Sequence, residues 1–133
     1  MDPGEIEQRY RQYIAALNAG RFDDAAQFYS LRVRYEGQDF DRDQFRDLVL
    51  TLGRQVAPDT QNTIDCVLVQ GDTLAARLVR TGVAIRDFMG IPPTGRPVSL
   101  REHAFYHLAD DGCDEVWSVI DLAPLLQPGG SPG

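Results

Sequence analysis

The chemistry that this chain can perform is expected to centre on an aspartate near its C-terminus. Asp121 lies in one of the most apolar stretches that surround any acid of the chain, between Val116 and Leu126. A carboxyl group with an ordinary pKa near ~4 is a poor base toward carbon, and removal from water raises its proton affinity. The sequence therefore predicts a general acid/base at Asp121. The alternative is that its side chain caps the segment beginning at Leu122.

Two histidines precede this aspartate at a spacing that resembles a metal motif. On a helix, the four-residue offset of His103 and His107 would bring their rings together, whereas on a strand it separates them by roughly 13 Å. The β-rich residues 98–108 favour a strand, so no metal site is predicted. His107 is predicted to be a second catalytic group or the hydrogen-bond partner of one, with an ordinary surface histidine as the alternative.

Further residues are candidates for binding a substrate. Trp117 shares strand parity with Asp121, and Tyr35 ends a strand with a hydroxyl that needs a partner if buried. Arg77 and Arg80 lie three residues apart on a predicted strand, so they point to opposite faces, and one of them is expected to orient a carbonyl or ester. The residues predicted to bind substrate are Trp117, Tyr35, Phe105, His103, Arg77 and Phe88. Core packing or solvent exposure is the alternative for each.

Composition narrows the possible chemistry. The 133 residues carry a net charge of −7, and all 13 basic residues are arginine. Without lysine no Schiff base can form, and neither a phosphate loop ending in Gly-Lys-Ser/Thr nor a GxGxxG motif is present. The acidic balance disfavours nucleic acid, and no apolar run is long enough to span a bilayer. We therefore expect a cytoplasmic protein with no cofactor and two free thiols, at Cys66 and Cys113.

The first half of the chain reads as helical with one strand. A first helix ending near Asn18 is predicted from one apolar face, formed by Ile6, Tyr10, Tyr13, Ile14 and Leu17. A shorter helix is expected over residues 21–29, then a strand in which Leu31, Val33 and Tyr35 alternate with charged residues. Asp41 and Gln44 form a capping box before a third helix that ends at Gly53.

The second half reads as long strands. They are expected at residues 63–70, 73–88, 98–108 and 115–121, with turns at Gly71-Asp72 and Asp110–Gly112 and a loop from Gly90 to Gly95. Helices followed by antiparallel strands predict an α+β fold, with helices on one face of a curved sheet and a cavity between the layers. Residues 1–126 are expected to form one domain, and residues 127–133 a flexible tail.

Three linked motifs resemble the SnoaL-like polyketide cyclases. They are Gly90-Ile-Pro-Pro-Thr-Gly95 in a loop, a strand that ends in Asp111-Gly112, and Glu115-Val-Trp-Ser-Val-Ile-Asp121. The resemblance implies a nuclear transport factor 2-like cone, with N-terminal helices in the concave face of a curved antiparallel sheet, assembled as a homodimer or homotetramer. Ala104 stands where many relatives carry an acid, with Glu102 and His103 beside it.

The same resemblance implies an intramolecular aldol-type ring closure, the work of a cyclase, isomerase or lyase of secondary metabolism. Its substrate would be a hydrophobic polyketide or related small molecule, and by motif position the acid/base would be Asp121, with His107 as a supporting group. An epoxide hydrolase or dehydratase would require a second acid and an arginine, for example Arg77 or Arg101 beside Asp121. A non-catalytic ligand-binding or dimerisation module of the same fold is the third alternative.

Overall fold

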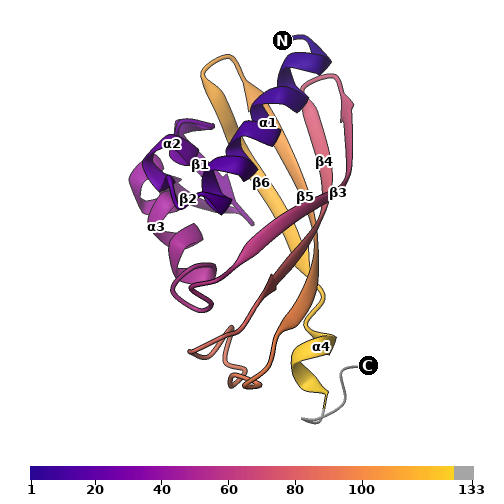
Figure 1. Ribbon diagram of the computed structural model, residues 1–133. Helices are drawn as coiled ribbons and strands as arrows, with labels where there is room; N and C mark the ends of the chain where they lie inside the picture. Colours follow the sequence, from indigo (N-terminus) through magenta and orange to yellow (C-terminus); the bar gives the residue numbers. More distant parts are fainter. Residues whose placement is uncertain (128–133) are drawn as a thin grey trace.

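The structure, a computed structural model that describes residues 1–127, is an α+β fold built on one curved, unclosed sheet (Figure 1). The six strands follow the spatial order β2-β1-β6-β5-β4-β3. The elements along the chain are α1 (Pro3–Asn18), α2 (Phe22–Ala26), β1 (Tyr29–Tyr35), β2 (Gln38–Asp41), α3 (Arg42–Leu52), β3 (Gln61–Gln70), β4 (Thr73–Gly82), β5 (Val98–Ala109), β6 (Gly112–Ile120) and α4 (Ala123–Leu126). The predicted fold class is confirmed.

Helix α1 forms as its sequence predicts. Asp2 caps its N-terminus by accepting hydrogen bonds from the backbone of Gly4 and Glu5, and the predicted apolar face is buried. At the other end, the Asn18 side chain donates to the carbonyl of Asn62 and accepts from its N–H, both at 2.8 Å. This exchange holds the end of α1 against the start of β3.

The second helix is shorter than predicted, because Tyr29 belongs to the following strand. Helix α2 ends at Ala26, and β1 then runs parallel to β6, with Tyr29 opposite Cys113. The register shifts between Tyr29 and Arg34, so Leu31 is exposed and the alternation expected at this end of the strand is wrong. Helix α3 follows its predicted capping box at Asp41.

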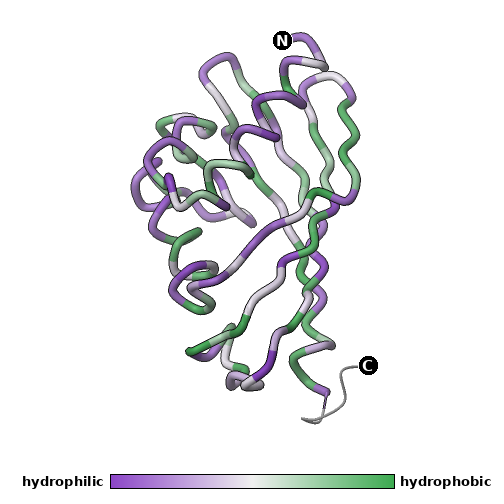
Figure 2. Tube along the Cα trace, viewed as in Figure 1, coloured by the Kyte–Doolittle hydropathy of each residue, from purple (hydrophilic) through white to green (hydrophobic). Residues whose placement is uncertain are grey.

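The long strands form antiparallel hairpins with the predicted turns. Strand β4 ends at Gly82, well before the predicted end at Phe88, because the N–H of Val83 donates to the Asp59 carboxylate and leaves the ladder. The strands and helices carry mixed polar and apolar residues rather than uniformly apolar stretches (Figure 2). That is the pattern of elements with one buried face.

Strand parity divides the sheet into an inner face beneath the helices and an outer face. On β5, Leu100, Ala104, Tyr106 and Leu108 point inward and are buried. The outer face carries four large exposed apolar side chains, Leu68, Phe105, Trp117 and Val119. Cys66 and Cys113 are free thiols, the first exposed and the second buried. Within residues 1–127, no helix combines the length and apolar character needed to cross a membrane.

Candidate functional site

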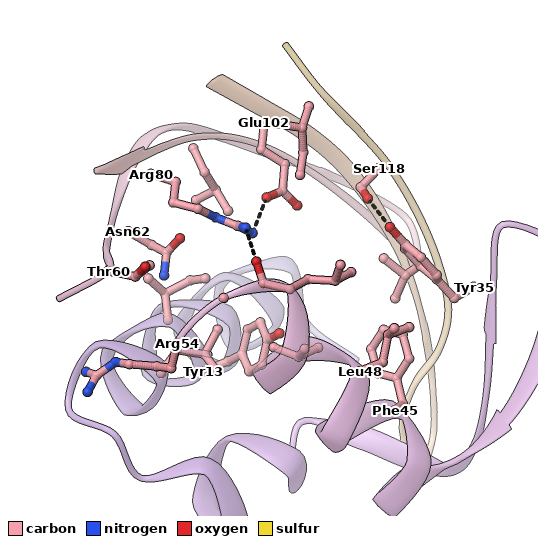
Figure 3. Close-up of a pocket in the computed structure, with 18 of the residues that line it drawn as sticks. Tyr13, Tyr35, Phe45, Leu48, Arg54, Thr60, Asn62, Arg80, Glu102 and Ser118 are labelled. Carbon is pink, nitrogen blue, oxygen red and sulfur yellow. Dashed lines mark hydrogen bonds and ion pairs between the residues drawn. The ribbon is translucent and has the colours of Figure 1, made fainter. Parts of the chain in front are cut away.

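A cavity lies between the inner face of the sheet and helices α1 and α3 (Figure 3). Its volume is about 90 Å³, and it opens to solvent at a wider mouth. Most of the wall is apolar or aromatic, including Phe45, Leu48 and Leu78. The charged side chains of the lining are Arg54, Arg80 and Glu102. Such a mixture is typical of a small-molecule site.

Among the described residues that line the cavity, Glu102 is the one acid, and it is held in an ion pair. Arg80 Nη2 donates to Glu102 Oε1 at 2.9 Å, and the two side chains are 20% and 12% exposed. Arg80 Nη1 donates to the carbonyl oxygen of Leu52 at 3.0 Å, at the end of α3. Among residues 1–127, the second carboxylate oxygen of Glu102 has no hydrogen bond from the protein. Glu102 is thus fixed through one oxygen, with the other free for a ligand.

Buried tyrosine hydroxyls lie near this pair. Tyr29 donates to the hydroxyl oxygen of Tyr13 at 2.6 Å, and both rings line the cavity. Burial raises the pKa of Tyr13 well above its usual value, Glu102 raises it further, and Arg80 opposes the shift. Tyr13 therefore stays protonated at neutral pH. Its own proton has no acceptor in the described part of the chain, so it can donate to an oxygen atom of a ligand.

The opposite wall offers a second pair of hydroxyls. Tyr35 Oη and Ser118 Oγ lie 2.8 Å apart, one from the end of β1 and the other from β6 (Figure 3). Because two hydroxyls share one hydrogen bond, the pair retains a donor that a ligand can use. Tyr35 is the one residue of the predicted substrate-binding set that lines this cavity.

The other predicted substrate-binding residues lie elsewhere. Phe88 is buried in a second, smaller cavity on the far side of Arg80. The remaining four, His103, Phe105, Arg77 and Trp117, point to the outer face of the sheet. Arg77 forms an ion pair there with Asp65 at 3.2 Å, so the prediction that Arg77 and Arg80 face opposite ways is confirmed. Of these two arginines, Arg80 is the one that lines the cavity, together with Arg54.

The predicted desolvation of Asp121 is wrong, because its side chain is exposed. Asp121 follows β6 at the same parity as Trp117 and Val119, which point outward, and it is absent from the cavity lining. Its carboxylate accepts the backbone N–H of Ala123, the first residue of α4, at 3.0 Å. The N-cap residue of α4 is Leu122 rather than Asp121, so this is a local contact at the start of the helix and not its cap. The catalytic roles of Asp121 and His107 stay predictions.

His107 lies at the far end of β5 and contacts an acid outside the cavity. Its Nδ1 is 2.6 Å from Asp114 Oδ1, and this hydrogen bond raises the pKa of His107 above its usual value of 6.5. Since the pKa is raised on folding, the contact stabilises the fold below pH 6.5, and that contribution is lost as the pH rises through the pKa of the folded state.

We expect Asp114→Asn to lower the pKa of His107 toward the value of a free histidine. The measurement is an NMR pH titration of the two imidazoles, with the signals assigned by a His103→Asn variant. Because the pair is largely exposed, the change in the free energy of unfolding should be small. An unchanged pKa in Asp114→Asn would mean that the two side chains do not pair in solution.

Sequence reasoning missed Glu102 as the acid of the cavity, although the signal was present. The even positions of β5 carry the apolar residues that must face the core, so Glu102 shares their face. The apolar residues next to Asp121 in the sequence were a weaker indication of burial than strand parity. Residues adjacent in sequence on a strand point to opposite faces.

The comparisons with known proteins identify the family and the fold. The family model described as SnoaL-like polyketide cyclase matches residues 7–128. The chain belongs to the SnoaL-like polyketide cyclase family. None of the curated proteins compared with it matches. This SnoaL-like chain also resembles solved structures over nearly its whole length.

A SnoaL-like polyketide cyclase from Agrobacterium tumefaciens is 28% identical with a TM-score of 0.85, and the match covers 95% of this chain and 97% of that one. AclR, a putative hydroxylase from Streptomyces galilaeus, is 24% identical with a TM-score of 0.78, covering 94% and 95%. A putative ketosteroid isomerase from Kribbella flavida is 18% identical with a TM-score of 0.70, covering 99% and 85%. The last two matches show the shared cone fold alone.

Proposed function

We propose that this SnoaL-like protein is a cyclase or isomerase that performs acid–base carbon chemistry, without a cofactor, on a polyketide or related secondary-metabolite intermediate. The observation that carries the proposal is the placement of one fixed carboxylate, Glu102, in the same cavity as a buried phenol with a free proton, Tyr13. Family membership supports the class of reaction. In this proposal the acid of the cavity takes the role that the sequence predicted for Asp121.

The reaction needs one group that takes and returns a proton and one that stabilises an oxyanion. Glu102 removes a proton from the carbon next to a carbonyl; the electron pair of the C–H bond forms the C=C bond of the enolate, and the π pair of the carbonyl moves to its oxygen. Tyr13 donates a hydrogen bond to that enolate oxygen. The enolate carbon then attacks a second carbonyl of the same molecule, and the new alkoxide takes the proton back from Glu102. Substrate and product are isomers.

The size of the cavity limits which part of the substrate enters it. An engineered cavity of roughly 150 Å³ holds the six carbons of benzene, so about 90 Å³ holds roughly three or four non-hydrogen atoms. That is the reacting carbonyl with the carbons next to it. The rest of a polycyclic substrate would extend through the mouth.

The test is deuterium exchange at carbon, which detects proton abstraction even when the natural substrate is unidentified. The protein is incubated in D₂O with aromatic β-keto methyl esters, and loss of the α-hydrogen signal is followed by NMR. We expect exchange faster than in buffer alone, and slower with Tyr13→Phe because the enolate loses its hydrogen bond. Ring closure would appear as a product of equal mass with a changed absorbance.

The same assay separates the alternatives. If the esters bind but exchange deuterium no faster than in buffer, the enzyme hypothesis is overturned in favour of a binding module. Loss of exchange in Asp121→Asn, with the rate retained when Glu102 is replaced, would return the acid/base role to Asp121. No specific feature favours epoxide hydrolysis, which requires two acids where the cavity lining offers one.

We further propose that the outer face of the sheet pairs with a second copy of the chain. Phe105, Trp117 and Val119 are 52%, 40% and 70% exposed and lie on the neighbouring strands β5 and β6. Three large apolar side chains on adjacent strands are costly to leave in water. A two-fold contact of this face would cover the same residues on both copies.

We expect the wild-type protein to sediment as a dimer and Val119→Asp to sediment as a monomer. Ile85→Asp is the matched control, since Ile85 is 61% exposed but lies in the loop after β4. It should leave the sedimentation of the dimer unchanged. A monomeric wild type, or a dimer that tolerates Val119→Asp, would contradict this interface.

A further inference from the structure

A second, smaller cavity lies next to the first, behind Arg80. Its volume is about 40 Å³, and its wall is almost entirely apolar. Phe88, Val98, Leu100, Val56 and Leu125 supply most of that wall. They come from the loop between α3 and β3, from the loop after β4, from β5 and from α4.

The two cavities share part of their walls. Leu52, Gly53, Thr60 and Arg80 line both. Arg80 is the charged residue of this shared wall: it pairs with Glu102 on the side of the main cavity, and its guanidinium lies 5.9 Å from the ring centroid of Phe88, which lines the smaller one. A group that extends past Arg80 therefore leaves the Arg80–Glu102 ion pair and enters almost entirely apolar surroundings.

The loops around the smaller cavity are fixed by hydrogen bonds rather than loosely placed. The N–H of Ile85 donates to the carbonyl of Val56 at 2.7 Å, and Phe88 exchanges two backbone hydrogen bonds of 2.9 Å with Ile91. The cavity is thus built into the fold. An engineered cavity of roughly 150 Å³ holds the six carbons of benzene, so about 40 Å³ holds roughly one or two non-hydrogen atoms.

From this geometry we propose that the smaller cavity is a subsite for the last one or two carbons of a short alkyl chain on the molecule whose carbonyl lies beside Glu102. The inference rests on the proposed function, because it takes the main cavity as the ligand site. It adds a substrate class: ketones with an ethyl or propyl group on the reacting carbonyl, in preference to a methyl group or a long chain.

The test is the affinity of a series of alkyl phenyl ketones, from acetophenone to hexanophenone, measured by NMR titration of the full chain. Each methylene that enters an apolar site should lower Kd by about fourfold. We expect this gain for the first one or two methylenes added to acetophenone and none beyond. Ala84→Phe places a ring in the smaller cavity and should remove the gain while acetophenone still binds. Ile85→Phe, at the exposed neighbouring position, should keep it.

A second variant tests the subsite independently, in case Ala84→Phe does not fold. Leu125→Ala enlarges the smaller cavity from α4 and should move the preferred chain length up by one or two carbons. If acetophenone binds but Kd does not depend on chain length, or the gain persists in Ala84→Phe, the subsite is overturned and the proposed function is untouched. If none of the ketones binds and no β-keto ester exchanges deuterium, the main cavity itself is overturned as a ligand site.

Discussion

Glu102→Gln is expected to lower the rate of catalysed proton exchange by about 10²- to 10⁴-fold, the usual contribution of a general acid/base. Glutamine keeps the length of the side chain and an oxygen for Arg80, but it cannot take a proton from carbon. Ligand affinity should therefore change much less than kcat. The measurement is kcat and KM of deuterium exchange, compared with Asp121→Asn, which makes the same chemical change at an exposed carboxylate.

The stability of the variant must be measured alongside the rate, because the Glu102→Gln substitution also breaks an ion pair. The side chains of Arg80 and Glu102 are 20% and 12% exposed, and loss of one partner leaves the other charge poorly compensated. Arg80 keeps its hydrogen bond to Leu52, so a moderate fall in Tm is expected. Rates are therefore compared well below the Tm of the variant. A Glu102→Gln protein with the wild-type rate would end the proposal that Glu102 moves the proton.

The architecture of the protein was predictable from local patterns, because each element carries its own signal. The capping box at Asp41, the apolar face of α1 and the turn at Gly71-Asp72 each depend on residues close together in the chain. The errors came at boundaries decided by tertiary contacts. Tyr29 joins β1 rather than α2 because β6 lies beside it, and that neighbour is more than 80 positions away in sequence.

The site was predictable only in part, because it depends on which face of a strand each residue occupies. Tyr35 was found from its place at the end of a strand, whereas four of the predicted residues lie on the outer face. Their aromatic and charged character, taken as a sign of ligand binding, fits an exposed face that pairs with another chain. The partnership of Arg80 and Glu102 across β4 and β5 follows from the strand register, which the sequence alone does not specify.

Gly112→Ala is expected to destabilise the fold by about 3 kcal/mol or more, because this glycine lies directly against the backbone of β1. Its φ is +137°, and an added Cβ would lie 2.9 Å from the carbonyl oxygen of Phe28, 2.9 Å from the carbonyl carbon of Tyr29 and 3.0 Å from the nitrogen of Ser30. All three are backbone atoms, so no side chain can move aside. The next residue, Cys113, donates its N–H to Phe28 at 2.9 Å.

The matched control is Gly71→Ala, in the turn between β3 and β4. Gly71 also has a positive φ, of +59°, but a Cβ there would meet nothing within 4 Å. The control should therefore cost only about 1–2 kcal/mol for the left-handed backbone. Thermal unfolding followed by circular dichroism should place the Tm of Gly112→Ala about 10 °C or more below that of the wild type, with Gly71→Ala between them.

Gly112→Ala should also disturb the wall of the cavity. Strand β1 carries both Tyr29, which donates to Tyr13, and Tyr35, which pairs with Ser118, so any shift of β1 away from β6 displaces two hydroxyl contacts in the wall. We expect weaker ketone binding in Gly112→Ala even at temperatures where it is folded, and unchanged binding in Gly71→Ala. Equal stability and binding in the two variants would show that β1 does not approach β6 this closely. The hydroxyl-lined wall of the cavity would then require another explanation, since the parallel pairing of these two strands is what brings the end of β1 to Ser118.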